Sequence, residues 1–202
     1  MANADAAFGL RPIRYISGAP YNGAVNVYYV SDTTNDLFIG SPVSSAGTAV
    51  GGVEQVNAIT VDDSTPTNNT PIAGVIVGFA DSADGGQLRD DLRYVASGST
   101  AYALVADDPN LLFLVQEDGN LGNAGVGAHY NLEDVGSGDT VTGLSGVQID
   151  SSTATATDSD HVYNVRVVRV NDKPDNSVGT NANWEVAIVN HRAVAGGPNK
   201  AV

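Results

Sequence analysis

Short apolar runs separated by turn-forming residues make up most of the chain. The most apolar stretch holds two of them, Ala101–Ala106 and Leu111–Gln116, separated by Asp-Asp-Pro-Asn at residues 107–110. Each run is too short for a helix and is rich in Tyr, Leu, Val or Phe, which favours buried strands. Because Asp, Pro and Asn favour turns, the pattern predicts a β-hairpin here, at the centre of the core.

Further strands are expected on both sides of this stretch. The nearly continuous apolar run at residues 72–79 predicts a strand buried on both faces. Residues 161–170 and 184–191 alternate between apolar and polar, and we expect these two strands to pair. The inward-facing residues of the second would be Trp184, Val186 and Ile188. Weaker strands are indicated at residues 25–30, 37–43 and 53–61, and a single short helix within residues 81–94.

Turn residues around many short strands are typical of a sandwich or a barrel. We therefore expect an all-β fold in which residues 15–192 form a single β-sandwich or barrel-like domain. Residues 193–202 predict a flexible C-terminal tail. Residues 1–14 predict an extended N-terminal arm, whose apolar anchors are Phe8, Leu10 and Ile13.

The charge balance excludes several classes of partner. Asp and Glu number 23 against 9 Lys and Arg, which gives a formal net charge of −14. Nucleic acids and anionic membrane surfaces are bound by clustered Lys and Arg, which the sequence lacks, so we expect neither as a partner. The sequence has no signal-peptide pattern and no long apolar run, which predicts a protein made in a cytoplasm and not inserted in a membrane.

No motif predicts catalysis or cofactor binding. The chain has no cysteine, so thiolate chemistry is excluded. His129, His161 and His191 lack the spacing of a metal-binding pair, which favours surface or hydrogen-bonded histidines over a metal site. Ser145 lacks the spacing of a nucleophile elbow, and the calcium-like residues 81–85 lack the closing Glu. We expect no catalytic, metal or cofactor site and no enzymatic activity.

The opening run, residues 2–12 (ANADAAFGLRP), resembles the start of small structural proteins of tailed bacteriophages. Similar stretches follow at residues 37–43, 74–77, 108–118, 149–152 and 184–191, so the likeness spans nearly the whole chain. The role it resembles most is that of a capsid decoration, or cement, protein. The resemblance implies a homotrimer on the outside of the virion head that clamps neighbouring major capsid protein subunits. Arg11, Pro12 and Pro42 match the pattern.

The predicted arm suits such a role, because an extended segment can add a strand to an exposed sheet edge of a partner. Many copies bound around closed symmetry would add avidity. Deleting residues 1–11 is then expected to abolish attachment to heads while leaving the β body folded. The partner-binding residues we expect are Phe8, Leu10, Arg11, Pro12, Ile13 and Arg14.

Three other functions stay open on the sequence. A tail or receptor-binding accessory protein would contact host glycans through surface loops such as residues 62–71. A hydrolase in a β fold would use His161 or His191 as a base beside a serine. The shell-forming protein itself is a further option, which the short chain and the scarcity of helix signals weaken.

Overall fold

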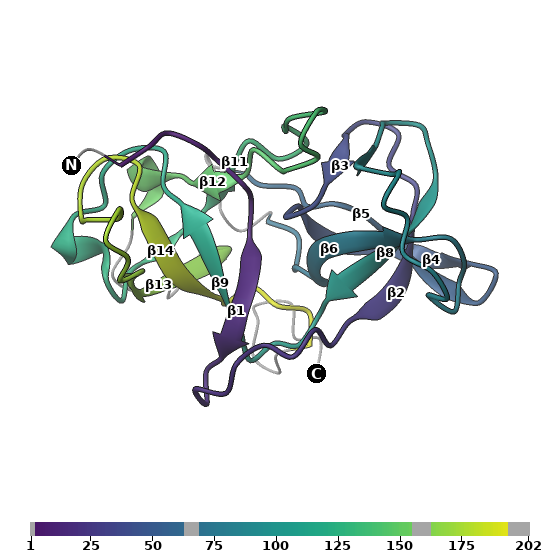
Figure 1. Ribbon diagram of the computed structural model, residues 1–202, viewed down its shortest axis with the longest axis horizontal. Coiled ribbons are helices and arrows are strands. Elements are labelled where there is room, and N and C mark those ends of the chain that lie inside the picture. The colour runs from purple at the N-terminus through teal and green to yellow at the C-terminus, as the bar shows by residue number, and fades with distance from the viewer. Residues whose placement is uncertain (1–2, 63–68, 155–162, 194–202) are drawn as a thin grey trace.

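The chain is all-β in the computed structural model, which describes residues 3–62, 69–154 and 163–193. Two lobes lie side by side along the long axis of the molecule (Figure 1). The sheet lobe is a five-stranded sheet whose order is β1 (Arg11–Tyr15), β9 (Leu111–Gln116), β14 (Asn183–Ile188), β13 (Val165–Val170) and β10 (His129–Tyr130). The barrel lobe is a closed barrel in the order β2 (Asn26–Val30), β5 (Val53–Ala58), β4 (Pro42–Val50), β6 (Gly74–Ala80) and β8 (Ala101–Ala106).

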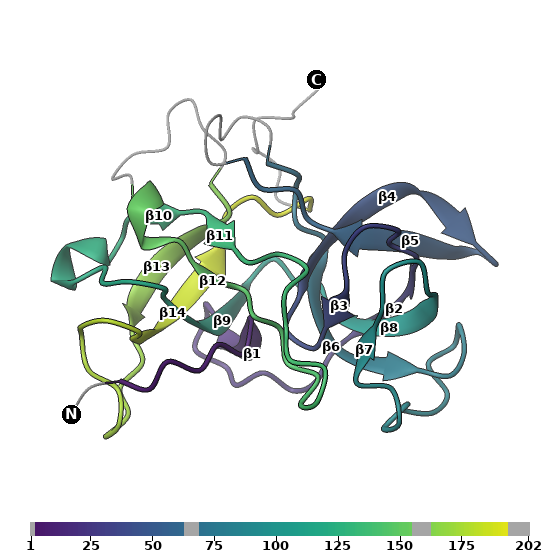
Figure 2. The ribbon, with the colours of Figure 1, turned by 90° about the horizontal axis from the view of Figure 1, so that it is seen from above.

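Two small sheets and two short 3-10 helices complete the described part of the chain. β3 (Leu37–Phe38) pairs with β7 (Tyr94–Val95), and β11 (Leu132–Glu133) pairs with β12 (Gln148–Ile149). The 3-10 helices are η2 (Asn123–Gly125) and η3 (Ser151–Thr153), and the described residues contain no α-helix. Figure 2 shows both helices near β10, on the side of the sheet lobe that faces away from the barrel lobe.

The helix predicted within residues 81–94 is wrong. Asp81 and Gln87 close a loop there, because the amide of Asp81 donates to the carbonyl of Gln87 at 3.1 Å. The Asp81 carboxylate also accepts from the amide of Gln87 at 3.1 Å. A side chain that satisfies backbone amides in this way favours a turn over a helix.

The strands β8 and β9 have the predicted bounds, but they do not pair with each other, so the predicted hairpin is wrong. β8 lies between β2 and β6 in the barrel, whereas β9 lies between β1 and β14 in the sheet lobe. Both edges of each strand are occupied by strands from elsewhere in the chain, and every residue of β9 is buried. Residues 107–110 therefore form a crossing between the lobes and not a hairpin turn.

Polar contacts tie this crossing to both lobes. The carboxylate of Asp107 accepts a hydrogen bond from the Tyr28 hydroxyl of β2 at 2.7 Å. The same hydroxyl accepts from Nη2 of Arg192, which follows β14, at 2.6 Å. Arg192 also forms an ion pair with Glu54 of β5. These contacts hold the barrel lobe against the C-terminal end of the sheet lobe.

The apolar core is shared between the lobes. The larger cluster of buried side chains joins Trp184 and Phe113 of the sheet lobe to Ile72, Val75 and Ala106 on the barrel side. A second cluster fills the barrel itself. Fully burying a large apolar side chain is worth roughly 1.5–3 kcal/mol. Because the larger cluster draws on both lobes, each lobe contributes to the stability of the other.

The pairing predicted for the last two strands is confirmed. β13 and β14 run antiparallel, from Val165 opposite Ile188 to Val170 opposite Trp184. The side chains expected to face inward are all buried, namely Trp184, Val186 and Ile188. The first residues of the predicted strand, 161 and 162, lie outside the described part of the chain.

The N-terminal segment is extended, as predicted, but it lies on the body and does not project from it. The amide of Ala6 donates to Oε1 of Gln116 at 2.9 Å, and Nε2 of Gln116 donates to the carbonyl of Ala4 at 2.8 Å. β1 then pairs antiparallel with β9. The strand addition that we expected toward a partner thus takes place within the chain, and the predicted boundary between residues 14 and 15 falls inside β1.

Some expectations fall on residues outside the described part of the chain. These are most of the predicted C-terminal tail (194–202), the middle of the predicted glycan-binding loop (63–68) and His161. Among the described residues, no helix combines the length and the apolar character needed to cross a lipid bilayer.

Candidate protein-docking site

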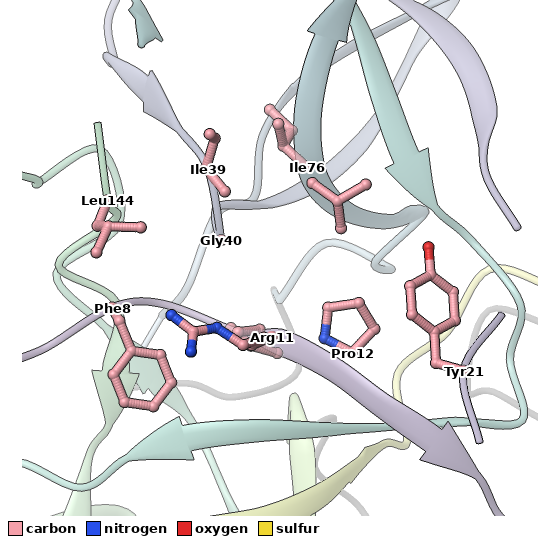
Figure 3. Close-up of a pocket in the computed structure, with 10 residues that line it drawn as sticks. Phe8, Arg11, Pro12, Tyr21, Ile39, Gly40, Ile76 and Leu144 are labelled. Atoms are coloured by element: carbon pink, nitrogen blue, oxygen red, sulfur yellow. The ribbon is translucent and has the colours of Figure 1, made fainter. Parts of the chain in front are cut away.

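A hollow of about 270 Å³ lies where the N-terminal segment meets the barrel lobe, and we call it the junction groove (Figure 3). Its lining is mainly apolar and comes from segments that are far apart in the sequence. Four of the six partner-binding residues expected from the sequence belong to it. The lining residues are Phe8, Leu10, Arg11, Pro12, Tyr21, Ile39, Gly40, Ile76, Val77 and Leu144.

Two glycines allow the N-terminal segment to cross the connection between β3 and β4 at the groove. Gly9 and Gly40 have φ of 69° and 95°, which side chains other than glycine rarely adopt. A Cβ on Gly40 would lie 2.6 Å from the carbonyl oxygen of Phe8. The backbones are hydrogen-bonded at this point, since the amide of Leu10 donates to the carbonyl of Gly40 at 2.9 Å. The crossing therefore fixes one wall of the groove to the body.

Phe8 and Arg11 form a cation–π pair beside the groove. The guanidinium carbon of Arg11 lies 5.0 Å from the centre of the Phe8 ring, and Figure 3 shows the two side chains next to each other. Arg11 is exposed, and no ion pair joins it to a carboxylate among the described residues. Phe8 is half-buried. The pair thus offers a partner both an apolar ring and an unused positive charge.

Two of the expected partner-binding residues belong to the fold and not to a free surface. Leu10 is only 1% exposed and is part of the larger core cluster, although its atoms reach the groove wall. Ile13 is half-buried in β1, and its carbonyl accepts from the amide of Tyr21 at 3.2 Å. Packing of Leu10 and the backbone bond of Ile13 already tie these two positions to the body, so Phe8, Arg11 and Pro12 are the more accessible members of the predicted set.

Arg14 is committed to a buried ion pair. Its Nη2 lies 2.6 Å from Oε2 of Glu185, whose side chain is only 4% exposed. Arg169 reaches the other oxygen of Glu185 from the neighbouring strand at 2.9 Å. Burial alone would raise the pKa of Glu185, but the hydrogen bonds from Arg169 and Arg14 outweigh it and hold the pKa below its ordinary value. Arg14 stabilises the sheet lobe, and its charge is already used within the chain.

The sequence did not reveal a cluster of three carboxylates at the base of the small β11–β12 sheet. Oxygen atoms of Asp118, Glu133 and Asp150 lie within 4.8 Å of one another. Burial, and then the charges of Asp118, Asp150 and Asp134, raise the pKa of Glu133 to about 7. The structure brings together one oxygen from each carboxylate, fewer than the roughly six to eight ligand oxygens that Ca²⁺ takes, so the cluster alone does not define a metal site.

The residues weighed for a hydrolase do not come together in the described part of the chain. His191 is buried, and its Nδ1 accepts from the amide of Ala193 at 3.1 Å. Burial is the main cause that lowers the pKa of His191. Ser145 is also buried, and its hydroxyl contacts the hydroxyl of Ser41 at 3.3 Å. Among the described residues, no hydrogen bond joins His191 to a serine hydroxyl, which the hydrolase alternative requires.

Comparison with known proteins gives no match: no family model fits the sequence, and neither a curated protein nor a solved structure matches it. The resemblance to capsid decoration proteins therefore stays a prediction.

Apart from Gly40, the groove residues that sequence reasoning missed are Tyr21, Ile39, Ile76, Val77 and Leu144. Their only signal was indirect, because the phage-like stretches at residues 37–43 and 74–77 include three of them. Nothing in the local pattern indicated that these stretches meet residues 8–12, since that proximity depends on the crossing of the two backbones.

Proposed function

We propose that this chain is a structural protein of the head of a tailed bacteriophage. It binds the outside of the shell as a homotrimer and stabilises contacts between major capsid protein subunits. In this role it catalyses no reaction. The observation that carries the proposal is the junction groove, where the residues of the phage-like opening run, Phe8, Arg11 and Pro12, line an accessible and mainly apolar hollow.

The groove has properties that suit attachment to another protein. Its N-terminal wall is held by the glycine crossing and by the bond from Leu10 to Gly40, so little ordering is left to occur on binding. Aromatic residues and arginine are the side chains most often found to dominate binding energy at interfaces. The groove supplies both through Phe8 and Arg11.

Weak single contacts are sufficient in this role. Copies arranged around closed symmetry on a shell bind with an avidity that exceeds the affinity of one contact. The net charge of −14 keeps free copies apart in solution, because like-charged molecules repel one another. Binding is then decided at the few places where the surface offers apolar area and positive charge.

The experiment mixes the purified protein with heads that lack it and images the complexes by cryo-electron microscopy. We expect ordered density on the outside of the head. The variants F8A and R11E should lose this density, because they remove the ring and reverse the charge of the groove. The matched control is K173E, which reverses an exposed charge in the β13–β14 loop, away from the groove, and should bind as wild type.

Point variants replace the deletion of residues 1–11 as the test. That deletion would remove the buried Leu10 and the first residue of β1, so a loss of binding would not distinguish a lost contact from a lost fold. Heads decorated equally by the wild type and by both groove variants would contradict the proposal. Density confined to the tail would contradict it as well.

A further inference from the structure

A second hollow, of about 350 Å³, adjoins the junction groove, and we call it the outer hollow. The two share Ile39 and Val77 in their linings, so they meet across β6. The outer hollow continues from there along the loop between β6 and β7 to Thr142. The surface available to a partner is therefore longer than the junction groove alone.

The two most exposed large apolar side chains of the described residues stand at the outer hollow. Leu88, which lines it, is 65% exposed, and Val141, next to the lining residue Thr142, is 70% exposed. Val141 is held in place, because its carbonyl accepts a hydrogen bond from Arg93. Exposed apolar side chains gathered at a hollow are typical of a surface that another protein covers.

Positive charge is concentrated on the same surface. The two hollows together are lined by three of the nine Lys and Arg of the chain, Arg11, Arg89 and Arg93, but by only one of its 23 Asp and Glu, Asp90. Arg89 is neutralised by Asp91 at 2.7 Å. Arg11 and Arg93 form no ion pair with a carboxylate among the described residues. An acidic protein thus keeps two guanidinium groups without an ion pair in the described part of the chain beside an apolar channel, although Arg93 also donates to the carbonyl of Val141 and its charge helps to lower the pKa of Asp139.

We propose that the two hollows form one docking channel for an extended segment of a partner protein that carries apolar side chains together with carboxylates. The apolar side chains cover the surface from Phe8 to Leu88, and the carboxylates pair with Arg11 and Arg93. Charge complementarity selects this occupant, because two exposed guanidinium groups without an ion pair among the residues that the structure describes favour a segment that brings carboxylates of its own. The inference rests on the proposed function for the identity of the partner, which is then a segment of the major capsid protein.

The first experiment uses a library of random decapeptides displayed on ribosomes and selected on the full-length protein. We expect the selected peptides to be enriched in Asp or Glu together with Leu, Ile or Phe. Their affinity should fall about tenfold for R11E and for R93E, which corresponds to about 1.4 kcal/mol per lost charge pair. It should also fall for L88S, and it should be unchanged for K173E. Selected peptides without carboxylates, or no selected peptides, would overturn the docking channel.

The second experiment separates this inference from the proposed function. Heads that lack the protein are mixed with the wild type and with R93E, whose exposed position makes loss of folding a poor explanation for lost binding. Heads decorated equally by both would overturn the channel and leave the proposed function standing. Carboxylate-bearing peptides that bind the channel of a protein which decorates no heads would support the channel and contradict the function.

A second copy of the chain is the remaining occupant, since every copy is acidic. Sedimentation equilibrium of the wild type and of R93E distinguishes this case. Equal masses for the two proteins support a foreign segment in the channel. Self-association of the wild type that R93E abolishes would overturn it in favour of a contact between copies.

Discussion

Arg11 and Arg14 lie on the same strand and, because a bulge separates Pro12 from Arg14, on the same face of the sheet lobe. Their surroundings are nevertheless opposite. Arg14 is held by its ion pair with the buried Glu185, whereas Arg11 is exposed and lies over the ring of Phe8. The charge of Arg14 is paired within the fold, whereas Arg11 forms no ion pair among the described residues. A run of similar residues can thus contain both a structural anchor and a binding group, and only the partner of each side chain distinguishes them.

The largest effect on stability is expected at the glycine crossing, which holds the N-terminal segment against the body just before the two arginines. G40A should lower the free energy of unfolding by about 3 kcal/mol or more, because the new Cβ meets the carbonyl of Phe8 in a backbone conformation that strains alanine. Urea unfolding measures the loss. G47A is the matched control, since Gly47 also has a positive φ but has open space around it. A loss as large for G47A would show that strain, and not the crossing, dominates.

Removing the structural arginine comes next. R14M should cost about 2 kcal/mol, since Glu185 keeps only the more exposed Arg169. The stability that Glu185 contributes is present above its unfolded pKa and is lost as the pH falls. Because R14M brings the folded pKa of Glu185 closer to its unfolded value, the variant should lose less stability than the wild type as the pH falls through the acidic range. Urea unfolding measured across the acidic range tests this, and identical acid limbs for the two proteins would contradict it.

Glu133 is the counterpart of Glu185, because carboxylates surround it where Glu185 has arginines. Its pKa of about 7 means that the folded state binds a proton more tightly than the unfolded state, so stability falls as the pH rises from 4.5 to 7. E133Q should therefore be more stable than the wild type at alkaline pH, by an amount of the order of 1 kcal/mol, and equal to it at acidic pH. Thermal unfolding at both extremes tests the prediction. A gain of equal size at both would refute it.

The smallest effect on stability is expected for the free arginine. R11M should change the free energy of unfolding by less than about 0.5 kcal/mol, because an exposed cation–π pair contributes little. The same variant should fail to decorate heads. The pair R11M and R14M carries one substitution at two positions of one strand, so any difference between them reports the surroundings. A cost for R11M near that of R14M would show that both arginines stabilise the fold.

The local pattern of the sequence predicts where strands lie but not always which strands pair. Ala101–Ala106 and Leu111–Gln116 have the bounds that their apolar runs predict. Their pairing could not be read from the sequence, because runs that are apolar at nearly every position carry no alternation that marks a register or a neighbour. The two strands near the C-terminus alternate more clearly, and their pairing was predicted correctly.

The candidate site shows the same limit. Phe8, Arg11 and Pro12 were identified because they belong to one short run. Leu10 and Arg14 belong to that run as well, but long-range contacts with the core and with Glu185 assign them to the fold. Contacts of this kind join residues from distant parts of the chain, and a single sequence gives no signal for them. The carboxylate cluster was missed for the same reason, because its members come from three separate segments.

The order of strands along the chain has a consequence for biosynthesis. β1 leaves the ribosome first, yet its neighbour β9 is translated only after all five barrel strands. The barrel can close while translation continues, because units of a nascent protein generally fold as they emerge. β1, however, cannot pair until β9 has been synthesised. The part of the groove that residues 8–12 line is therefore among the last to form. A nascent chain that lacks β9 cannot present the complete groove to a partner.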